Sequence, residues 1–174
     1  MIRLFLAFTS FLPLKTNHSF GSFIGYLLYL FNSEAKSVSK QNLEICFPGL
    51  SEFELKSLLK KVLTETGKGL TESGLIWNQN FTDNAKLIRN INGEHYLDSS
   101  KKTILLVPHM GCWEITGRVL AEKRKVTFMY RPLRSNKQND YLFSRRNQGN
   151  LKMASADKLG ILKIQRALNN GDLV

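Results

Sequence analysis

Residues 103–114, with the sequence TILLVPHMGCWE, decide how this chain is interpreted. The first five of them form a short apolar run, which is typical of a fully buried β-strand. Pro108 ends the run, His109 follows, and Gly111 permits a tight turn. Glu114 comes five residues after the histidine, which is the wrong spacing for two partners on one helix face. The spacing instead predicts a histidine in the loop and a carboxylate in the first turn of the next helix.

A histidine and a carboxylate in this arrangement can form a general base and its orienting partner. One ring nitrogen donates to the carboxylate, and the other can take a proton from a substrate hydroxyl. No protein nucleophile is required, so the pattern suits direct transfer of an acyl group to a hydroxyl. The spacing alone is not specific, because a histidine and a carboxylate that fall at a loop by chance would produce the same pattern.

From Lys101 onward, expected strands and helices alternate, which predicts an α/β fold with a largely parallel sheet and flanking helices. Residues 172–174 would open a further strand, so the chain is expected to be part of a longer, truncated protein. The expected helices are 113–121, 140–148 and one that begins at Asp157 and ends at residues 169–171, and the expected strands are 103–107, 126–130 and 151–154.

The N-terminal residues 1–31 are strongly apolar, but polar residues and Pro13 divide them into two pieces. Each piece is shorter than the ~20 apolar residues that a membrane-spanning helix needs. We therefore predict membrane-embedded or interfacial helices in residues 1–31, and buried helices of a soluble domain are the alternative. Residues 32–174 would form the N-terminal part of a single α/β domain whose C-terminal part is missing.

A long helix is expected after Pro48-Gly49. Ser51 and Glu54 have the spacing of a capping box, in which each residue satisfies a backbone group of the other. Leucines and a valine then follow at helical spacing. Three glycines at positions 67, 69 and 74 interrupt this pattern, and close packing against another helix is the expected reason.

The charge of +11 is unevenly distributed along the chain. Residues 1–100 hold ten Lys or Arg and nine Asp or Glu, whereas residues 101–174 hold fifteen and five. Such a surplus attracts phosphates, although it also fits an ordinary solvated surface. Few aromatic residues lie among these basic residues, which argues against nucleic-acid binding. Two cysteines without metal-type spacing predict no metal site, and no dinucleotide fingerprint follows a strand.

Four stretches in order along the chain resemble one known family. Residues 109–114 resemble the His-x-x-x-x-Asp/Glu motif of the glycerolipid acyltransferase superfamily, and more narrowly the His-x-Gly-x-Trp-Glu form of bacterial lipid A biosynthesis late acyltransferases (lauroyl and myristoyl acyltransferases). Residues 42–48, NLEICFP, are similar to an Asn-Leu-x-x-Cys-Phe-Pro segment of that family. Residues 126–132 resemble its strand ending in Tyr-Arg-Pro, and residues 145–149 resemble its arginine-glycine segment.

This resemblance implies roles for particular residues. His109 would be the general base that deprotonates a hydroxyl of an acylated glucosamine lipid, and Glu114 would hold and polarise it. An arginine of the pair Arg145 and Arg146 would stabilise the oxyanion, with Arg146 slightly favoured. Four further residues would support the site: Arg131 and Arg134 by meeting phosphates, and Gly111 and Trp113 by shaping the turn.

The resemblance also implies substrates, partners and a location. The donor would be a fatty acyl thioester on acyl carrier protein or coenzyme A, and no other cofactor is expected. The acceptor would be a lipid A precursor, and the protein would contact membrane lipids at the cytoplasmic face of the bacterial inner membrane. The alternatives are a glycerophospholipid or other glycolipid acyltransferase, and a non-enzymatic basic module that binds a membrane surface or nucleic acid.

Overall fold

The computed structural model describes residues 2–97 and 101–174, which divide into two compact units, Met1–Asn78 and Gln79–Val174. The first unit is helical in its described residues, and the second combines helices with a small parallel sheet. The chain is therefore mostly helical, with the α/β character confined to the second unit. The predicted boundary after residue 31 separates the expected membrane-associated helices from the α/β domain. The division into compact units instead falls between Asn78 and Gln79.

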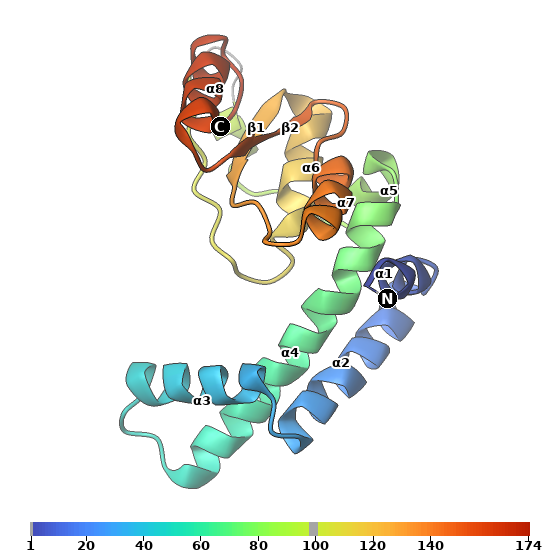
Figure 1. Ribbon diagram of the computed structural model, residues 1–174, viewed down its shortest axis with the longest axis vertical. Helices are drawn as coiled ribbons and strands as arrows, with labels where there is room; N and C mark the ends of the chain where they lie inside the picture. Colours follow the sequence, from blue (N-terminus) through green and yellow to red (C-terminus); the bar gives the residue numbers. More distant parts are fainter. Residues whose placement is uncertain (1, 98–100) are drawn as a thin grey trace. The chain divides into compact units, whose positions relative to one another are not determined.

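The described part of the N-terminal unit, residues 2–78, consists of four helices, and α2 runs alongside α4 (Figure 1). Pro13 separates the first two helices, as the sequence predicts, because its ring removes a backbone donor. None of the described helices combines the length and the apolar character needed to cross a bilayer, so membrane-spanning helices find no support here. The bounds are α1 Ile2–Ser10, α2 Leu14–Leu30, α3 Glu34–Cys46 and α4 Glu52–Asn78.

Glycines bring α2 and α4 into backbone contact. A Cβ atom on Gly67 would lie 2.1 Å from the carbonyl oxygen of Gly21 and 2.6 Å from the nitrogen of Gly25. The expectation of close helix packing is thus confirmed for Gly67, and α4 continues through it without a break. The same expectation is wrong for Gly69, because a Cβ atom there would meet no atom within 4 Å.

The capping box predicted for the start of α4 is present in full. The Glu54 carboxylate accepts a hydrogen bond from the Ser51 backbone nitrogen at 2.8 Å and one from its hydroxyl at 2.6 Å. The Glu54 backbone nitrogen in turn donates to the Ser51 hydroxyl at 3.3 Å. These contacts satisfy donors that the first turn of a helix leaves without partners, so a local sequence pattern defines where α4 begins.

The C-terminal unit is built around two parallel strands, β1 and β2, paired from Val126↔Leu151 to Tyr130↔Ser155. Helices α6 and α8 lie on opposite sides of these strands (Figure 1). Leu173 bridges to Val126 and also to Thr103, both in parallel. The elements are α5 Phe81–Ala85, the 3-10 helix Glu94–Leu97, α6 Glu114–Lys123, β1 Val126–Tyr130, α7 Asn136–Arg146, β2 Leu151–Ser155 and α8 Lys158–Asn169. The core is formed by Leu120, Ala121, Val126, Leu151 and Leu173.

The prediction of a fully buried strand at residues 103–107 is wrong. Thr103 forms only an isolated bridge, and the Leu105 nitrogen donates to the Val174 carbonyl at 2.7 Å. Leu105 packs against the core, whereas Ile104 and Leu106 are 65% and 91% exposed. The apolar run therefore behaves as an extended segment with one buried side. Periodicity alone cannot reveal this difference, because a buried strand and a half-buried one can share the same residues.

Candidate active site

The loop before α6 places His109 and Glu114 in the local structures that the sequence predicts. The Met110 nitrogen donates to the Pro108 carbonyl at 2.8 Å, which tightens the chain around the histidine. Gly111 has φ +55°, a left-handed conformation that glycine adopts without strain. Helix α6 begins at Glu114. The histidine is thus exposed on the loop, and the carboxylate stands in the first turn of the helix.

The Trp113 ring is the common neighbour of two predicted site residues. The His109 ring lies against it with centroids 4.5 Å apart and planes inclined by 53°. The Arg146 guanidinium lies over the same indole, 5.6 Å from its centre. A histidine, an aromatic ring and a cation are therefore grouped where the loop enters α6. Trp113 does more here than shape the turn, because it contacts side chains from two separate segments.

The Glu114 carboxylate forms an ion pair with Arg146 at the end of α7. The Arg146 Nε atom donates to Oε2 at 3.1 Å, and Nη2 donates to Oε1. The two side chains are only 12% and 16% exposed, so this contact is shielded from solvent. Two parallel hydrogen bonds to one carboxylate fix both its position and its orientation. The pairing of His109 with Glu114 stays a prediction.

The other three predicted arginines lie differently. The Arg145 guanidinium lies over the Tyr141 ring, 5.3 Å from its centre, on the same helix as Arg146. Arg131 and Arg134 are exposed in the loop between β1 and α7, where phosphate groups could reach them. The structure thus brings the Arg146 side chain to Glu114, and the roles predicted for Arg131, Arg134 and Arg145 stay predictions.

Arg118 lies beside these residues although no sequence motif singles it out; it is 2% exposed and lies four residues after Glu114 on α6. Its guanidinium donates to the carbonyl oxygens of Gln79 at 3.1 Å and Arg145 at 2.8 Å. The spacing of four, which places two residues on one helix face, could have pointed to it. A fully buried arginine is unusual, because charged side chains are buried only when they have partners, and the partners here are backbone carbonyls.

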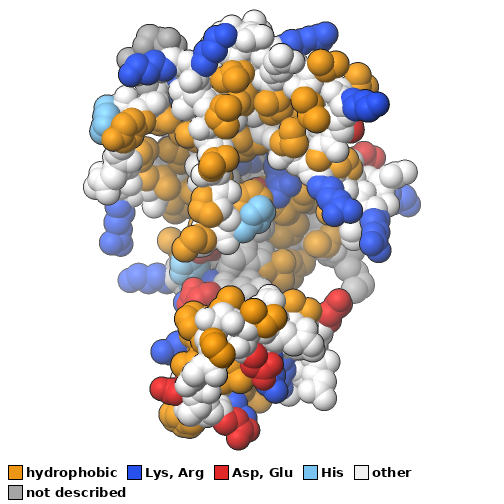
Figure 2. Space-filling view, turned by 90° about the vertical axis from the view of Figure 1, so that its left-hand side faces the viewer, with side chains coloured by type: hydrophobic (Ala, Val, Ile, Leu, Met, Phe, Trp, Pro, Cys, Tyr) orange, Lys and Arg blue, Asp and Glu red, His pale blue; other side chains and the backbone are white. Residues whose placement is uncertain are grey.

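The C-terminal unit carries most of the basic surplus, with seventeen Lys or Arg and eight Asp or Glu in residues 79–174. In Figure 2, blue Lys and Arg side chains are spread around orange hydrophobic ones on this unit. Such a surface attracts anionic groups in general and does not select one of them. Within residues 2–97 and 101–174, no three His, Cys, Asp or Glu side chains gather as a metal site would require.

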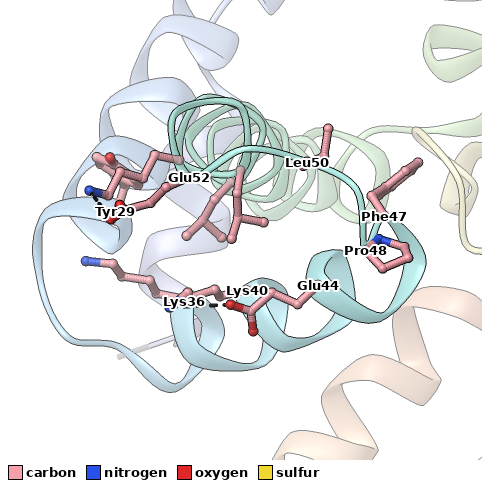
Figure 3. A pocket seen from close by; sticks show the side chains of 11 residues that line it. Tyr29, Lys36, Lys40, Glu44, Phe47, Pro48, Leu50 and Glu52 are labelled. Atoms are coloured by element: carbon pink, nitrogen blue, oxygen red, sulfur yellow. Dashed lines mark ion pairs between the residues drawn. The ribbon is translucent and has the colours of Figure 1, made fainter.

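A pocket of about 550 Å³ lies wholly within the N-terminal unit, and no predicted site residue lines it. Figure 3 labels Phe47, Pro48 and Leu50 among the lining residues and marks the Lys40–Glu44 ion pair with a dashed line. A second ion pair, Lys56–Glu52 at 2.7 Å, stands on α4. These pairs neutralise four of the five charges in the lining, so the pocket offers apolar surface and little net charge.

A loop histidine followed five residues later by a carboxylate at a helix start places the chain in the class of proteins with a His-x-x-x-x-Glu motif. Comparison over the whole chain then narrows this class. The sequence model of the bacterial lipid A biosynthesis acyltransferase family matches residues 2–174, and the chain belongs to this family.

Two relatives support this assignment. The chain is 29% identical over 168 residues to a lipid A biosynthesis lauroyltransferase of Escherichia coli (strain K12), covering 94% of this chain and 54% of the relative. It is 27% identical over 119 residues to a lipid A biosynthesis acyltransferase of Haemophilus influenzae, covering 66% of this chain and 37% of the relative. The chain therefore spans about half, or less, of the length of these relatives.

Proposed function

We propose that the protein transfers a fatty acyl chain from an acyl thioester to a hydroxyl of a lipid A precursor. One observation carries the proposal: His109 and the Glu114–Arg146 pair meet at Trp113, so a base, a carboxylate and a cation share one junction. Membership of the lipid A acyltransferase family supports the reaction class. The names of both relatives support the acceptor.

The proposed reaction requires one base and no covalent intermediate with the protein. A ring nitrogen of His109 takes the proton of the acceptor hydroxyl, and the oxygen attacks the thioester carbonyl carbon. The resulting tetrahedral oxyanion collapses, and the carbon–sulfur bond breaks. The thiolate then recovers the proton from the imidazolium, which leaves an ester, a free thiol and a neutral histidine.

Glu114 and Arg146 would supply the electrostatics of this reaction. Glu114 stands near the histidine in sequence, and its carboxylate would orient and stabilise the imidazolium. Arg146 contacts the same indole as His109, so an oxyanion formed beside the histidine would be close to this cation. This position supports Arg146 as the oxyanion-stabilising arginine.

The exposed arginines of the β1–α7 loop would bind phosphates of the substrates. Arg131 and Arg134 are both exposed, so phosphate groups can reach them from solvent. Acyl carrier protein and coenzyme A both present the acyl chain on a phosphopantetheine arm, and either could be the donor. Two arginines in one loop suit such phosphates because guanidinium groups bind them bidentately.

The N-terminal unit would hold the protein at the cytoplasmic face of the inner membrane. Helices α1 and α2 and the turn between them expose large apolar side chains that water solvates poorly, and an interface could bury them. These side chains include Leu4, Phe8, Phe11 and Phe23, which are 77%, 54%, 84% and 56% exposed. Their exposure supports a helix pair that lies on the membrane.

An acyl-transfer assay with acyl carrier protein and coenzyme A thioesters as donors, and a lipid A precursor as acceptor, tests the proposal. His109→Ala should lower kcat by about a hundredfold to ten-thousandfold, the usual contribution of a general base. His95→Ala is the matched control, because His95 is also exposed and also lies against an aromatic ring, Tyr96, at 4.1 Å. Full activity of His109→Ala would exclude the mechanism. Acylation of glycerol phosphates alone would exclude lipid A precursors as the acceptor.

A further inference from the structure

Arg118 is a buried cation whose described polar partners are backbone carbonyls. Its guanidinium donates from Nη1 to the Gln79 oxygen at 3.1 Å and from Nη2 to the Arg145 oxygen at 2.8 Å. Its face lies over the Phe81 ring, 4.7 Å from the ring centre. One side chain of α6 thus links two other segments of the unit, the residues before α5 and the last turn of α7.

The Arg145 carbonyl belongs to the end of α7, where backbone acceptors have no partner within the helix. A cation at this end also interacts favourably with the helix dipole. Arg118 therefore caps α7 from outside. Arg146 follows Arg145 directly in the chain, and its side chain holds the Glu114 carboxylate. Helix α6 consequently contacts the end of α7 through two side chains one turn apart, Glu114 and Arg118.

Burying this cation has a cost. Burial lowers the pKa of Arg118 to about 10, and the charge of Arg145 also lowers it, while Glu114 opposes the shift. The guanidinium is still protonated at neutral pH, so the charge is retained in a poorly solvated place. An apolar side chain would fill the same volume without this cost. What only a guanidinium provides is a rigid fork that reaches two carbonyls at once.

Arg124, at the other end of α6, makes similar contacts elsewhere. It donates to the carbonyl oxygens of Leu97 at 3.2 Å and Lys101 at 3.1 Å, and to that of Gly171. None of these acceptors belongs to α7 or to the candidate site. Within residues 2–97 and 101–174, Arg118 on α6 and Arg124 directly after this helix both bridge backbone carbonyls, and the Arg118 contacts include the segment that carries Arg146.

We propose that Arg118 is a positioning residue that places the Arg146 guanidinium against Glu114 by capping the last turn of α7. This inference rests on the proposed function, in which Glu114 and Arg146 serve acyl transfer. Without the cap, the last turn of α7 frays, and Arg146 loses the fixed backbone from which it reaches the carboxylate. Arg118 itself does not touch the reacting atoms.

The test follows the Nε–H proton of Arg146 by nuclear magnetic resonance, with the signal assigned through its loss in Arg146→Lys. In the unaltered protein this proton is held by Glu114 and should exchange slowly with water. Arg118→Met keeps much of the side-chain volume but has no donors, and it should speed the exchange by about tenfold, as for loss of a hydrogen bond to a charged group. Arg124→Met is the matched control and should leave the exchange unchanged.

Unchanged exchange in Arg118→Met, or equal acceleration in Arg124→Met, would overturn the proposal. If Arg118→Met does not fold, Arg118→Lys decides, because a single ammonium cannot span both carbonyls. Exchange faster than in the unaltered protein then supports the proposal, and unaltered exchange overturns it. In the acyl-transfer assay, Arg118→Lys should lower kcat more than it changes KM. A protein that transfers no acyl group would refute the proposed function, and the exchange measurement would still decide the role of Arg118.

Discussion

The Glu114–Arg146 pair should be one of the strongest polar interactions of the C-terminal unit. Both side chains are largely buried, and two hydrogen bonds join them. Removal of one partner from a buried pair leaves an uncompensated charge and costs about 3–5 kcal/mol. Exposed pairs contribute about 0–1 kcal/mol, because water screens them and their side chains lose entropy. The degree of burial thus predicts a large difference in free energy between buried and exposed ion pairs in this chain.

A double-mutant cycle measures this difference. The cycle uses Glu114→Gln, Arg146→Met and the double variant, and each free energy of unfolding comes from urea denaturation. We expect a coupling energy of about 2–3 kcal/mol, the value of a hydrogen-bonded charge pair with charged donor and acceptor. Amide hydrogen exchange in β1 and β2 should rank the stabilities of these variants in the same order as urea denaturation, which assigns the effect to the C-terminal unit.

The control cycle uses Asp83 and Lys86, which are 2.7 Å apart but 44% and 71% exposed. Its coupling energy should be clearly smaller than that of the Glu114–Arg146 pair, because water screens an exposed pair. If the Glu114–Arg146 coupling is no larger than that of this control, the burial argument fails, and the contact would not hold the carboxylate in place.

Three further predictions concern the N-terminal unit. Gly67→Ala should destabilise this unit by about 1–3 kcal/mol, because the new Cβ atom would overlap the backbone of α2. Gly69→Ala should stabilise it by about 0.5–1 kcal/mol. Urea denaturation that ranked the two variants in the opposite order would contradict this account. The hydrogen bonds from Ser51 lower the pKa of Glu54, so Ser51→Ala should raise that pKa toward its ordinary value in an NMR titration. The associated stabilisation is present above the unfolded-state pKa and is lost as the pH falls through the folded-state pKa. Phe11 is 84% exposed, and Phe11→Ser should weaken binding to anionic lipid vesicles by up to about 2–3 kcal/mol in a flotation assay, whereas equal binding would argue against membrane burial of this ring.

Much of the local structure could be predicted because it depends on neighbouring residues. Ser51 and Glu54 define the start of α4 through contacts within one turn. Pro13 separates α1 from α2 because its ring cannot continue the hydrogen-bond pattern of a helix. Gly111 allows the turn that leaves His109 on a loop and Glu114 at the start of α6.

The strand prediction failed where burial depends on distant segments. Residues 103–107 have a continuous apolar sequence, yet only Thr103 forms a bridge, and Leu106 is almost fully exposed. A strand becomes regular only when a neighbour pairs along its length, and the sequence of the strand itself does not contain that neighbour.

The sequence by itself determined where His109 and Glu114 lie locally, because five residues and a glycine are enough to specify a loop and a helix start. Only the tertiary structure decided that Glu114 meets Arg146, which lies 32 residues away, and that Arg118 caps the helix from which Arg146 extends. Periodicity and turn signals act over one or two turns of chain, whereas these contacts depend on how α7 packs against β2 and α6. The stretch TILLVPHMGCWE therefore contains the base and the carboxylate, and the cation that holds the carboxylate comes from the fold.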